Sequence, residues 1–207
     1  MTTLPRPSAT IIAFDGLVAD TLAARARAVS DAVTAEIGPC SLDEGLSLVQ
    51  GRSLDEAVEA AFVARAQTPA VEFDATLRDL AVLRARRSYT AMIAQGLPLR
   101  DGAADWIALR AASHGRVILR ADSARRDVER LIAFTGLQDV VAFVRCADDL
   151  PRPLGASSPE CAWAAIAGRL ATQRVALDQC VALECSDVSA AVARKYLSDV
   201  LVIETLM

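Results

Sequence analysis

The sequence predicts an α/β protein in which a Rossmann-like parallel sheet carries an inserted all-helical domain. A short apolar run at 10–14 is followed only by helical patterns, up to about residue 95. From residue 97 onward, four further apolar runs alternate with helical patterns. Apolar strands that alternate with helices are typical of a parallel sheet covered on both faces. We therefore predict a core of residues 1–21 and 97–207 and a helical cap of residues 22–96.

The cap is predicted to contain four helices. The first occupies 22–37, where apolar residues recur at helical spacing, and it ends at Gly38. Two capping boxes, each a Ser followed three residues later by a Glu, begin further helices at 41–44 and 53–56. A last helical stretch runs from about 70 to 95.

The core elements follow in alternation along the chain. After the strand at 10–14 we predict strands at 117–119, 140–144, 180–183 and 200–203, and helices at about 103–112, 123–135, 159–170 and 188–196. Gly115 and Gly136 each separate a predicted helix from the strand that follows it.

Composition argues against nucleic-acid and membrane partners. A net charge of −4 gives no electrostatic attraction to either. No apolar run approaches the ~20 residues of a membrane span, and residues 1–10 lack the apolar region of a signal peptide. The five cysteines are an odd number with no CxxC pair, which indicates reduced thiols. We therefore expect a cytoplasmic globular protein.

Six segments, taken in order, resemble motifs of the haloacid dehalogenase (HAD) phosphatases. Phe14-Asp15-Gly16-Leu17-Val18-Ala19-Asp20-Thr21 resembles the first motif, D-x-D-G-[TV]-[LV]-x-[DN]-[ST]. The others are 51–56, 97–102, 136–139, 148–152 and 180–186. They are similar to the branch that contains phosphoglycolate phosphatase and β-phosphoglucomutase. The resemblance implies the HAD-like fold, with its α/β core and helical cap.

The resemblance also implies a chemistry that needs several groups at the carboxyl ends of the core strands. An Asp nucleophile takes the phosphoryl group, and a second Asp two residues on is the general acid/base. A Ser or Thr and a Lys neutralise the phosphoryl oxygens. An acidic residue on the fourth strand holds Mg²⁺ together with the nucleophile.

The first motif departs from this pattern at the nucleophile. Asp15 matches the general acid/base, so the nucleophile position falls on Ala13. A methyl group can neither attack phosphorus nor bind a cation. The alternative register makes Asp15 the nucleophile, but it requires two residues to be deleted from the loop and leaves no second Asp beside it. Without a nucleophile, Asp15 is expected to be a vestige of the acid/base that bonds nearby amides and shapes the loop.

The second and third motifs lack their functional groups as well. The Ser/Thr position of the second motif falls on Ala121, and Ser123 is expected to cap the next helix. The Lys position of the third motif falls on Ala156 or Leu154, depending on where the gap is placed. Because Lys195 is the only lysine in the chain, no shift of the alignment within this loop supplies one.

In the fourth motif Glu184 matches, but the Mg²⁺-binding Asp is replaced by Cys185. A thiol is a poor ligand for a hard cation. Cys185 would need a cationic or histidine neighbour to become a nucleophile, and the only histidine, His114, is predicted at the opposite end of the sheet. We expect an inert thiol at Cys185, and Asp187 is expected to cap the helix that starts there.

These departures predict a HAD-like pseudoenzyme that acts by binding a protein or a phosphorylated small molecule. Arg52 in the cap and Arg120 and Arg152 near the core loops are the candidate ligand-binding residues. No cofactor and no metal are expected. The alternative is a HAD-type hydrolase of a small phosphate ester, in which Asp15 works with Mg²⁺ held by Glu184 and Asp187 in a non-standard site.

Overall fold

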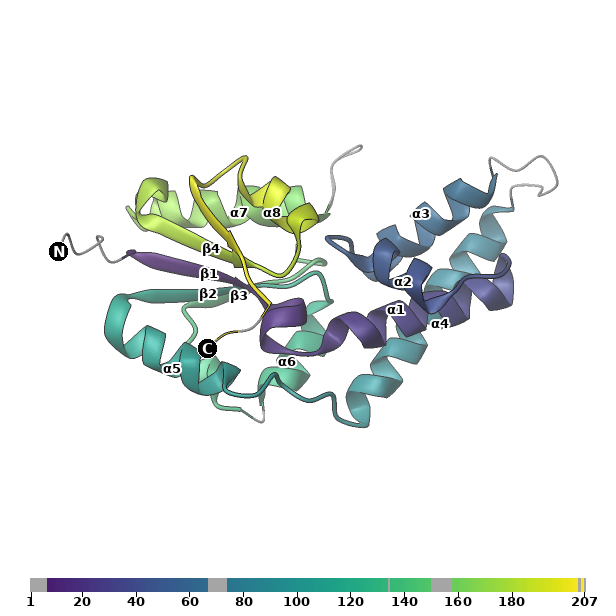
Figure 1. Ribbon diagram of the computed structural model, residues 1–207, viewed down its shortest axis with the longest axis horizontal. Helices are drawn as coiled ribbons and strands as arrows, with labels where there is room; N and C mark the ends of the chain where they lie inside the picture. The colour runs from purple at the N-terminus through teal and green to yellow at the C-terminus, as the bar shows by residue number, and fades with distance from the viewer. Residues whose placement is uncertain (1–6, 67–73, 134, 150–157, 205, 207) are drawn as a thin grey trace. The chain divides into compact units, whose positions relative to one another are not determined.

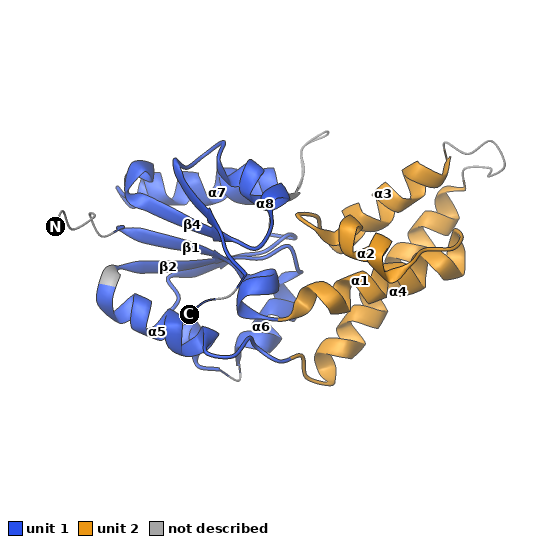
Figure 2. Ribbon diagram, in the orientation of Figure 1, with its two compact units in different colours: residues 1–19, 98–207 blue, residues 20–97 orange. Residues whose placement is uncertain are grey.

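The chain divides into two compact units, residues 1–19 with 98–207 and residues 20–97 (Figure 2). The computed structural model describes residues 7–66, 74–133, 135–149, 158–204 and 206. The first unit contains the predicted core elements, and the second contains the predicted helical insertion. None of the described helices is long and apolar enough to cross a membrane.

The described strands of the first unit form one parallel sheet (Figure 1). The strands are β1 (Ala9–Ala13), β2 (Arg116–Arg120), β3 (Phe143–Arg145), β4 (Cys180–Glu184) and β5 (Asp199–Val202). Their order across the sheet is β3-β2-β1-β4-β5. The predicted Rossmann-like parallel sheet is therefore confirmed.

The predicted strand at 140–144 is displaced toward the C-terminus. The amides of Val140 and Val141 both donate to the carbonyl of Leu137, at 3.2 and 3.0 Å, and so belong to a turn. The strand begins only at Phe143, which is paired with Ile118 of β2. The apolar pattern of residues 140–144 therefore did not show where the turn ends and the strand begins.

Helices cover both faces of this sheet. They are α5 (Ala103–His114), α6 (Arg125–Ala133), α7 (Ser158–Thr172) and α8 (Asp187–Ala193). In Figure 1, α7 and α8 lie on one face and α5 and α6 on the other. Trp163 and Ile166 of α7 and Ala193 of α8 pack in one apolar cluster with Ile11 and Ile118 of the sheet.

The second unit consists of helices α1 (Thr21–Glu36), α2 (Leu42–Val49), α3 (Leu54–Ala66) and α4 (Ala75–Ala94) in its described part. Both predicted serine caps are present, and one of the two predicted capping boxes is complete. The amide of Glu44 donates to Ser41 Oγ at 3.1 Å. The Ser53 box is reciprocal: its amide donates to Glu56 Oε2 at 2.8 Å, and its hydroxyl accepts from the Glu56 amide at 3.3 Å. The predicted start of the last helix, at 70–73, lies outside the described residues.

Gly45 allows α2 to pack closely against α1. A Cβ atom on Gly45 would lie 2.6 Å from the carbonyl oxygen of Ala26, a backbone atom that cannot move aside alone. We expect Gly45→Ala to lower the free energy of unfolding by about 1–2 kcal/mol, because overpacking outweighs the gain in helix propensity. Gly168 in α7 is the matched control, since a Cβ atom there meets nothing within 4 Å. Gly168→Ala should stabilise by up to about 1 kcal/mol, so equal urea midpoints for the two variants would contradict this packing argument.

Candidate functional site

The central strands β1, β2 and β4 end side by side, where doubly wound folds place their ligands. Ala13, the last residue of β1, is paired with Arg120, the last residue of β2. On the other side, β1 pairs with β4 up to Leu183, and the next step of that register places Glu184 beside Ala13. Side chains alternate along a strand. Ala13, Arg120 and Glu184 therefore point to the same face of the sheet, the one that α7 and α8 cover.

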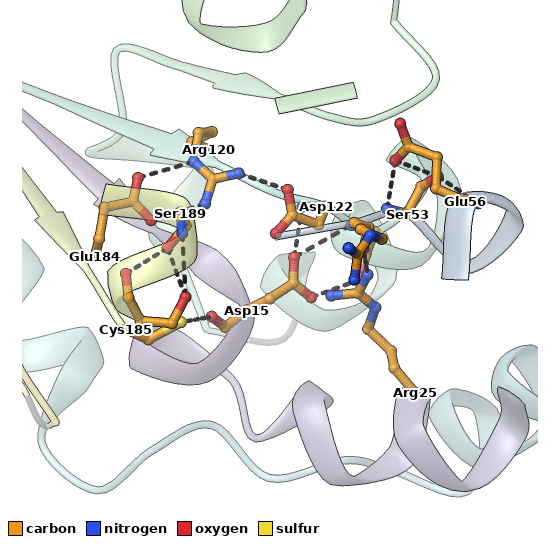
Figure 3. Close-up of polar contacts among 12 residues, drawn as sticks. Asp15, Arg25, Ser53, Glu56, Arg120, Asp122, Glu184, Cys185 and Ser189 are labelled. Atoms are coloured by element: carbon orange, nitrogen blue, oxygen red, sulfur yellow. Dashed lines mark hydrogen bonds and ion pairs between the residues drawn. The ribbon is translucent and has the colours of Figure 1, made fainter. Parts of the chain in front are cut away.

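A buried ion pair joins β2 to β4, the strands on either side of β1 (Figure 3). Arg120 Nε donates to Glu184 Oε1 at 3.0 Å, and Arg120 Nη2 donates to Glu184 Oε2 at 2.8 Å. The third guanidinium nitrogen, Nη1, donates to Asp122 Oδ1 at 2.5 Å. Two strands that flank a third are about 10 Å apart. The contact between Arg120 and Glu184 therefore bridges the end of β1, where Ala13 lies between them in the register.

Arg120 is positively charged, and its guanidinium is hydrogen-bonded to Glu184 and Asp122. Burial alone would lower the pKa of the guanidinium, but the charges of Asp122 and Glu184 outweigh it and hold the pKa above its ordinary value. The exposed fractions of Arg120 and Glu184 are 2% and 0%, so water does not compete for their hydrogen bonds. Two parallel N–H···O bonds between a guanidinium and a carboxylate are the strongest geometry for such a pair.

Asp15 links the loop after β1 to the loop after β2. It lies in the wide helical turn Phe14–Val18, where Gly16 has a φ of 92° that favours glycine. Its Oδ2 accepts from the amides of Asp122 at 2.6 Å and Ser123 at 3.1 Å, and its Oδ1 accepts from the Ser123 hydroxyl at 2.6 Å. The sequence interpretation of Asp15 as a loop-forming residue that bonds nearby amides is confirmed.

We expect Asp15→Ala to lower the free energy of unfolding by about 2–3 kcal/mol, because it deprives buried amides of an acceptor whose charged hydrogen bonds contribute about 1.5–3 kcal/mol. Asp15 is 3% exposed, so water cannot readily replace the carboxylate. Asp15→Asn keeps one carbonyl oxygen that can accept from the amides, so it should lower the free energy of unfolding by less. Urea denaturation compares the two; an Ala variant at least as stable as the Asn variant would contradict the linking role.

Cys185 follows β4 and faces the turn after β1. Its Sγ donates to the carbonyl oxygen of Asp15 at 3.2 Å. Burial, and next the negative charge of Glu184, raise the pKa of the Cys185 thiol to about 12. The thiol is therefore protonated near neutral pH, as expected for an inert cysteine.

Asp187 does not have the position that was expected of it. The residue that caps α8 is Ser186, whose hydroxyl accepts from the amide of Ser189 at 3.2 Å. Asp187 is the first residue of the helix and is exposed. The prediction that Asp187 is the cap was wrong because a Ser directly before the helix has the extended backbone of a cap residue.

The loop after β3 supplies the acid at the start of α6. Asp148 Oδ1 accepts from the amide of Arg125 at 2.8 Å, whereas Ser123, expected to cap this helix, directs its hydroxyl to Asp15. The Arg125 side chain forms a second bidentate pair, to Asp149, with distances of 2.6 and 2.7 Å. These contacts order the loops beside the strand ends.

The other predicted site residues have mixed outcomes. Ala121 is buried directly after β2, and its amide donates to the carbonyl of Arg145 at 2.7 Å. Arg52 belongs to the helical unit, where its Nη1 donates to the carbonyl of Leu48 at 3.2 Å. Arg152 and Ala156 lie outside the described residues. Of the three candidate arginines, the structure brings Arg120 into the site, bound to the chain's own carboxylates.

The residues at the strand ends do not fit Mg²⁺, which requires several oxygen ligands in near-octahedral geometry. Ala13 supplies a methyl group, Cys185 a thiol, and the carboxylate of Glu184 is bound to Arg120. Among the described residues no three acidic, His or Cys side chains are grouped to hold a metal ion. The alternative set of Asp15, Glu184 and Asp187 is not assembled, because Asp187 is exposed at the start of α8.

Sequence reasoning missed the partnership of Arg120 with Asp122 and Glu184. Arg120 was noted only as an attractor of external anions. A signal was nevertheless present: an Arg ends one apolar run and a Glu ends another. Charged residues are rarely buried unless they are paired, so two opposite charges at the ends of buried strands favour an ion pair.

The fold has close counterparts among solved structures, although no protein-family model and no curated protein sequence matches the chain. The chain is similar to a predicted phosphoglycolate phosphatase from Haemophilus somnus, with a TM-score of 0.74 and 11% identity over 91% of this chain and 81% of that one. The structure of CbbY from Rhodobacter sphaeroides in complex with phosphate gives a TM-score of 0.70 and 19% identity, over 96% of this chain and 88% of that one.

A haloacid dehalogenase-like protein from Agrobacterium tumefaciens gives a TM-score of 0.64 and 17% identity over 90% of this chain and 78% of that one. At such low identities the likeness establishes the fold and leaves the activity open. The parallel core sheet and the helical unit inserted after its first strand agree with the motifs read from the sequence. The chain has the fold of the HAD-type phosphoglycolate phosphatases and their β-phosphoglucomutase-like relatives.

Proposed function

We propose that this chain is a HAD-fold protein without phosphatase activity, a pseudoenzyme that acts by binding. The observation that carries the proposal is the end of β1, where Ala13 presents a methyl group at the position of the family's nucleophile. Ala121 replaces the Ser/Thr, Cys185 replaces the metal-binding Asp, and 149–160 contains no Lys. Each replacement removes a group that the phosphoryl transfer needs.

The surroundings of Asp15 argue against the register in which Asp15 is the nucleophile. β1 ends two residues earlier, and the carboxylate lies in the turn that follows. Both carboxylate oxygens accept hydrogen bonds from the loop after β2. An oxygen that is held in this way in a buried turn is poorly placed to attack an incoming ester.

The binding role favours a protein partner over a phosphorylated ligand. Asp15, Asp122 and Glu184 bring three carboxylates to the strand ends, and the guanidinium of Arg120 is bound to two of them. The guanidinium that could have bound a phosphate group is therefore occupied, and the carboxylates around it repel an anion. All five cysteines are free thiols, which supports the proposed cytoplasmic location.

Mg²⁺-dependent hydrolysis of an aryl phosphate and of a panel of phosphorylated metabolites tests the proposal. We expect no turnover above a no-protein control from the purified chain. We also expect none from Ala13→Asp, because the Ser/Thr, Lys and metal ligand are still missing. Turnover by the wild-type chain that Asp15→Asn abolishes would refute the proposal and establish the alternative, a hydrolase of small phosphate esters.

A further inference from the structure

We infer that Arg120 is a built-in cation that takes the place of a bound metal ion at the strand ends. The inference rests on the proposed function, since it concerns the same site. Asp15, Asp122 and Glu184 come from the loop after β1, the loop after β2 and the end of β4. A cluster of carboxylates buried at one edge of a sheet needs a compensating positive charge. Here the chain supplies that charge from its own β2.

The hydrogen bonds account for each of the three carboxylates. Glu184 receives both parallel N–H groups of the guanidinium, and Asp122 receives the third. Asp15 receives two backbone amides and a hydroxyl. Every carboxylate of the cluster therefore has donors from the protein, and both oxygens of Glu184 and of Asp15 are engaged.

The ion pair depends on the small residue between its partners. Arg120 and Glu184 end the strands that flank β1, and the path between them passes over Ala13. A methyl group leaves this path open. An Asp at the same position would put a fourth carboxylate beside Glu184 and would compete for the guanidinium. Ala13, Arg120 and Glu184 thus form a matched set, in which the lost nucleophile makes room for the internal cation.

The first test is the thermal unfolding midpoint of the wild-type chain in EDTA and with millimolar Mg²⁺, Mn²⁺ or Ca²⁺ at constant ionic strength. We expect the same midpoint in every case, because Arg120 already supplies the charge. A rise with a divalent ion that Glu184→Gln abolishes would overturn the inference. A chain that is stabilised by metal but hydrolyses no phosphate ester would refute this inference alone and leave the proposed function standing.

The second test removes the guanidinium group with the variant Arg120→Ala and adds free guanidinium ion to the solution. Guanidinium chloride at low millimolar concentration, compared with sodium chloride, should raise the midpoint of Arg120→Ala by at least about 2 °C. Arg125→Ala is the matched control, because it also removes an arginine that is bidentate to a carboxylate. It should respond less, because Asp149 keeps the Cys146 amide and the nearby Arg145 as partners. A folded Arg120→Ala variant with equal midpoints in the two salts would contradict the inference. If Arg120→Ala does not fold, the metal titration of the first test decides the matter, because it does not use that variant.

Discussion

Arg120→Met is expected to lower the free energy of unfolding by about 3–5 kcal/mol, the usual consequence of removing one partner from a buried ion pair. Methionine fills much of the same volume but carries no charge. Glu184, which is 0% exposed, and Asp122, which is 6% exposed, would then remain buried without the guanidinium. Urea denaturation followed by circular dichroism measures the loss.

Two further variants separate this effect from the loss of an arginine as such. The Arg125 side chain is 41% exposed, and its partner Asp149, although only 7% exposed, also accepts from the Cys146 amide and lies 3.7 Å from Arg145. Arg125→Met should therefore cost less than Arg120→Met, about 1–2 kcal/mol. The double variant Arg120→Met/Glu184→Met replaces the pair with apolar groups and should recover part of the lost stability. If Arg120→Met were as stable as Arg125→Met, the pair with Glu184 would not stabilise the core.

Cys185 is expected to react with iodoacetamide in the native state on the order of 10³-fold more slowly than a free cysteine at pH 8. The thiolate is the reactive form, and a pKa raised to about 12 keeps the thiol protonated throughout the neutral range. The rate should therefore rise about tenfold with each pH unit while the protein stays folded. Mass spectrometry of the modified peptides measures the rate at each pH.

The chain provides internal references for this measurement. Cys161 on α7 and Cys185 are both partly exposed, so the raised pKa of Cys185 should make it the slower of the two to be modified. In concentrated urea the burial is lost, and Cys185 should then react like any other cysteine. Rapid native modification of Cys185 alone would contradict the inert thiol and point to an activated nucleophile at the end of β4.

Local patterns predicted the order and type of the elements. The reciprocal capping box of Ser53 and Glu56 needs only residues within one turn of helix, so the sequence specifies it completely. Alternation of helices with apolar runs was sufficient for the parallel sheet. The start of β3 was not predictable in this way. It depends on which residue pairs with Ile118 of the neighbouring strand, and no local pattern in residues 140–144 encodes that partner.

The sequence by itself predicted, through the motifs that resemble those of the HAD phosphatases, that Ala13 and Cys185 stand where those enzymes carry catalytic groups. Only the tertiary structure decided which side chains meet at these strand ends. Arg120 and Glu184 are 64 residues apart in the chain, and they meet because β2 and β4 flank β1. Strand order decides which strand ends are neighbours, and it follows from the packing of the whole sheet. Arg120, which was predicted from the sequence to bind an external phosphate group, is therefore bound to the protein's own carboxylates.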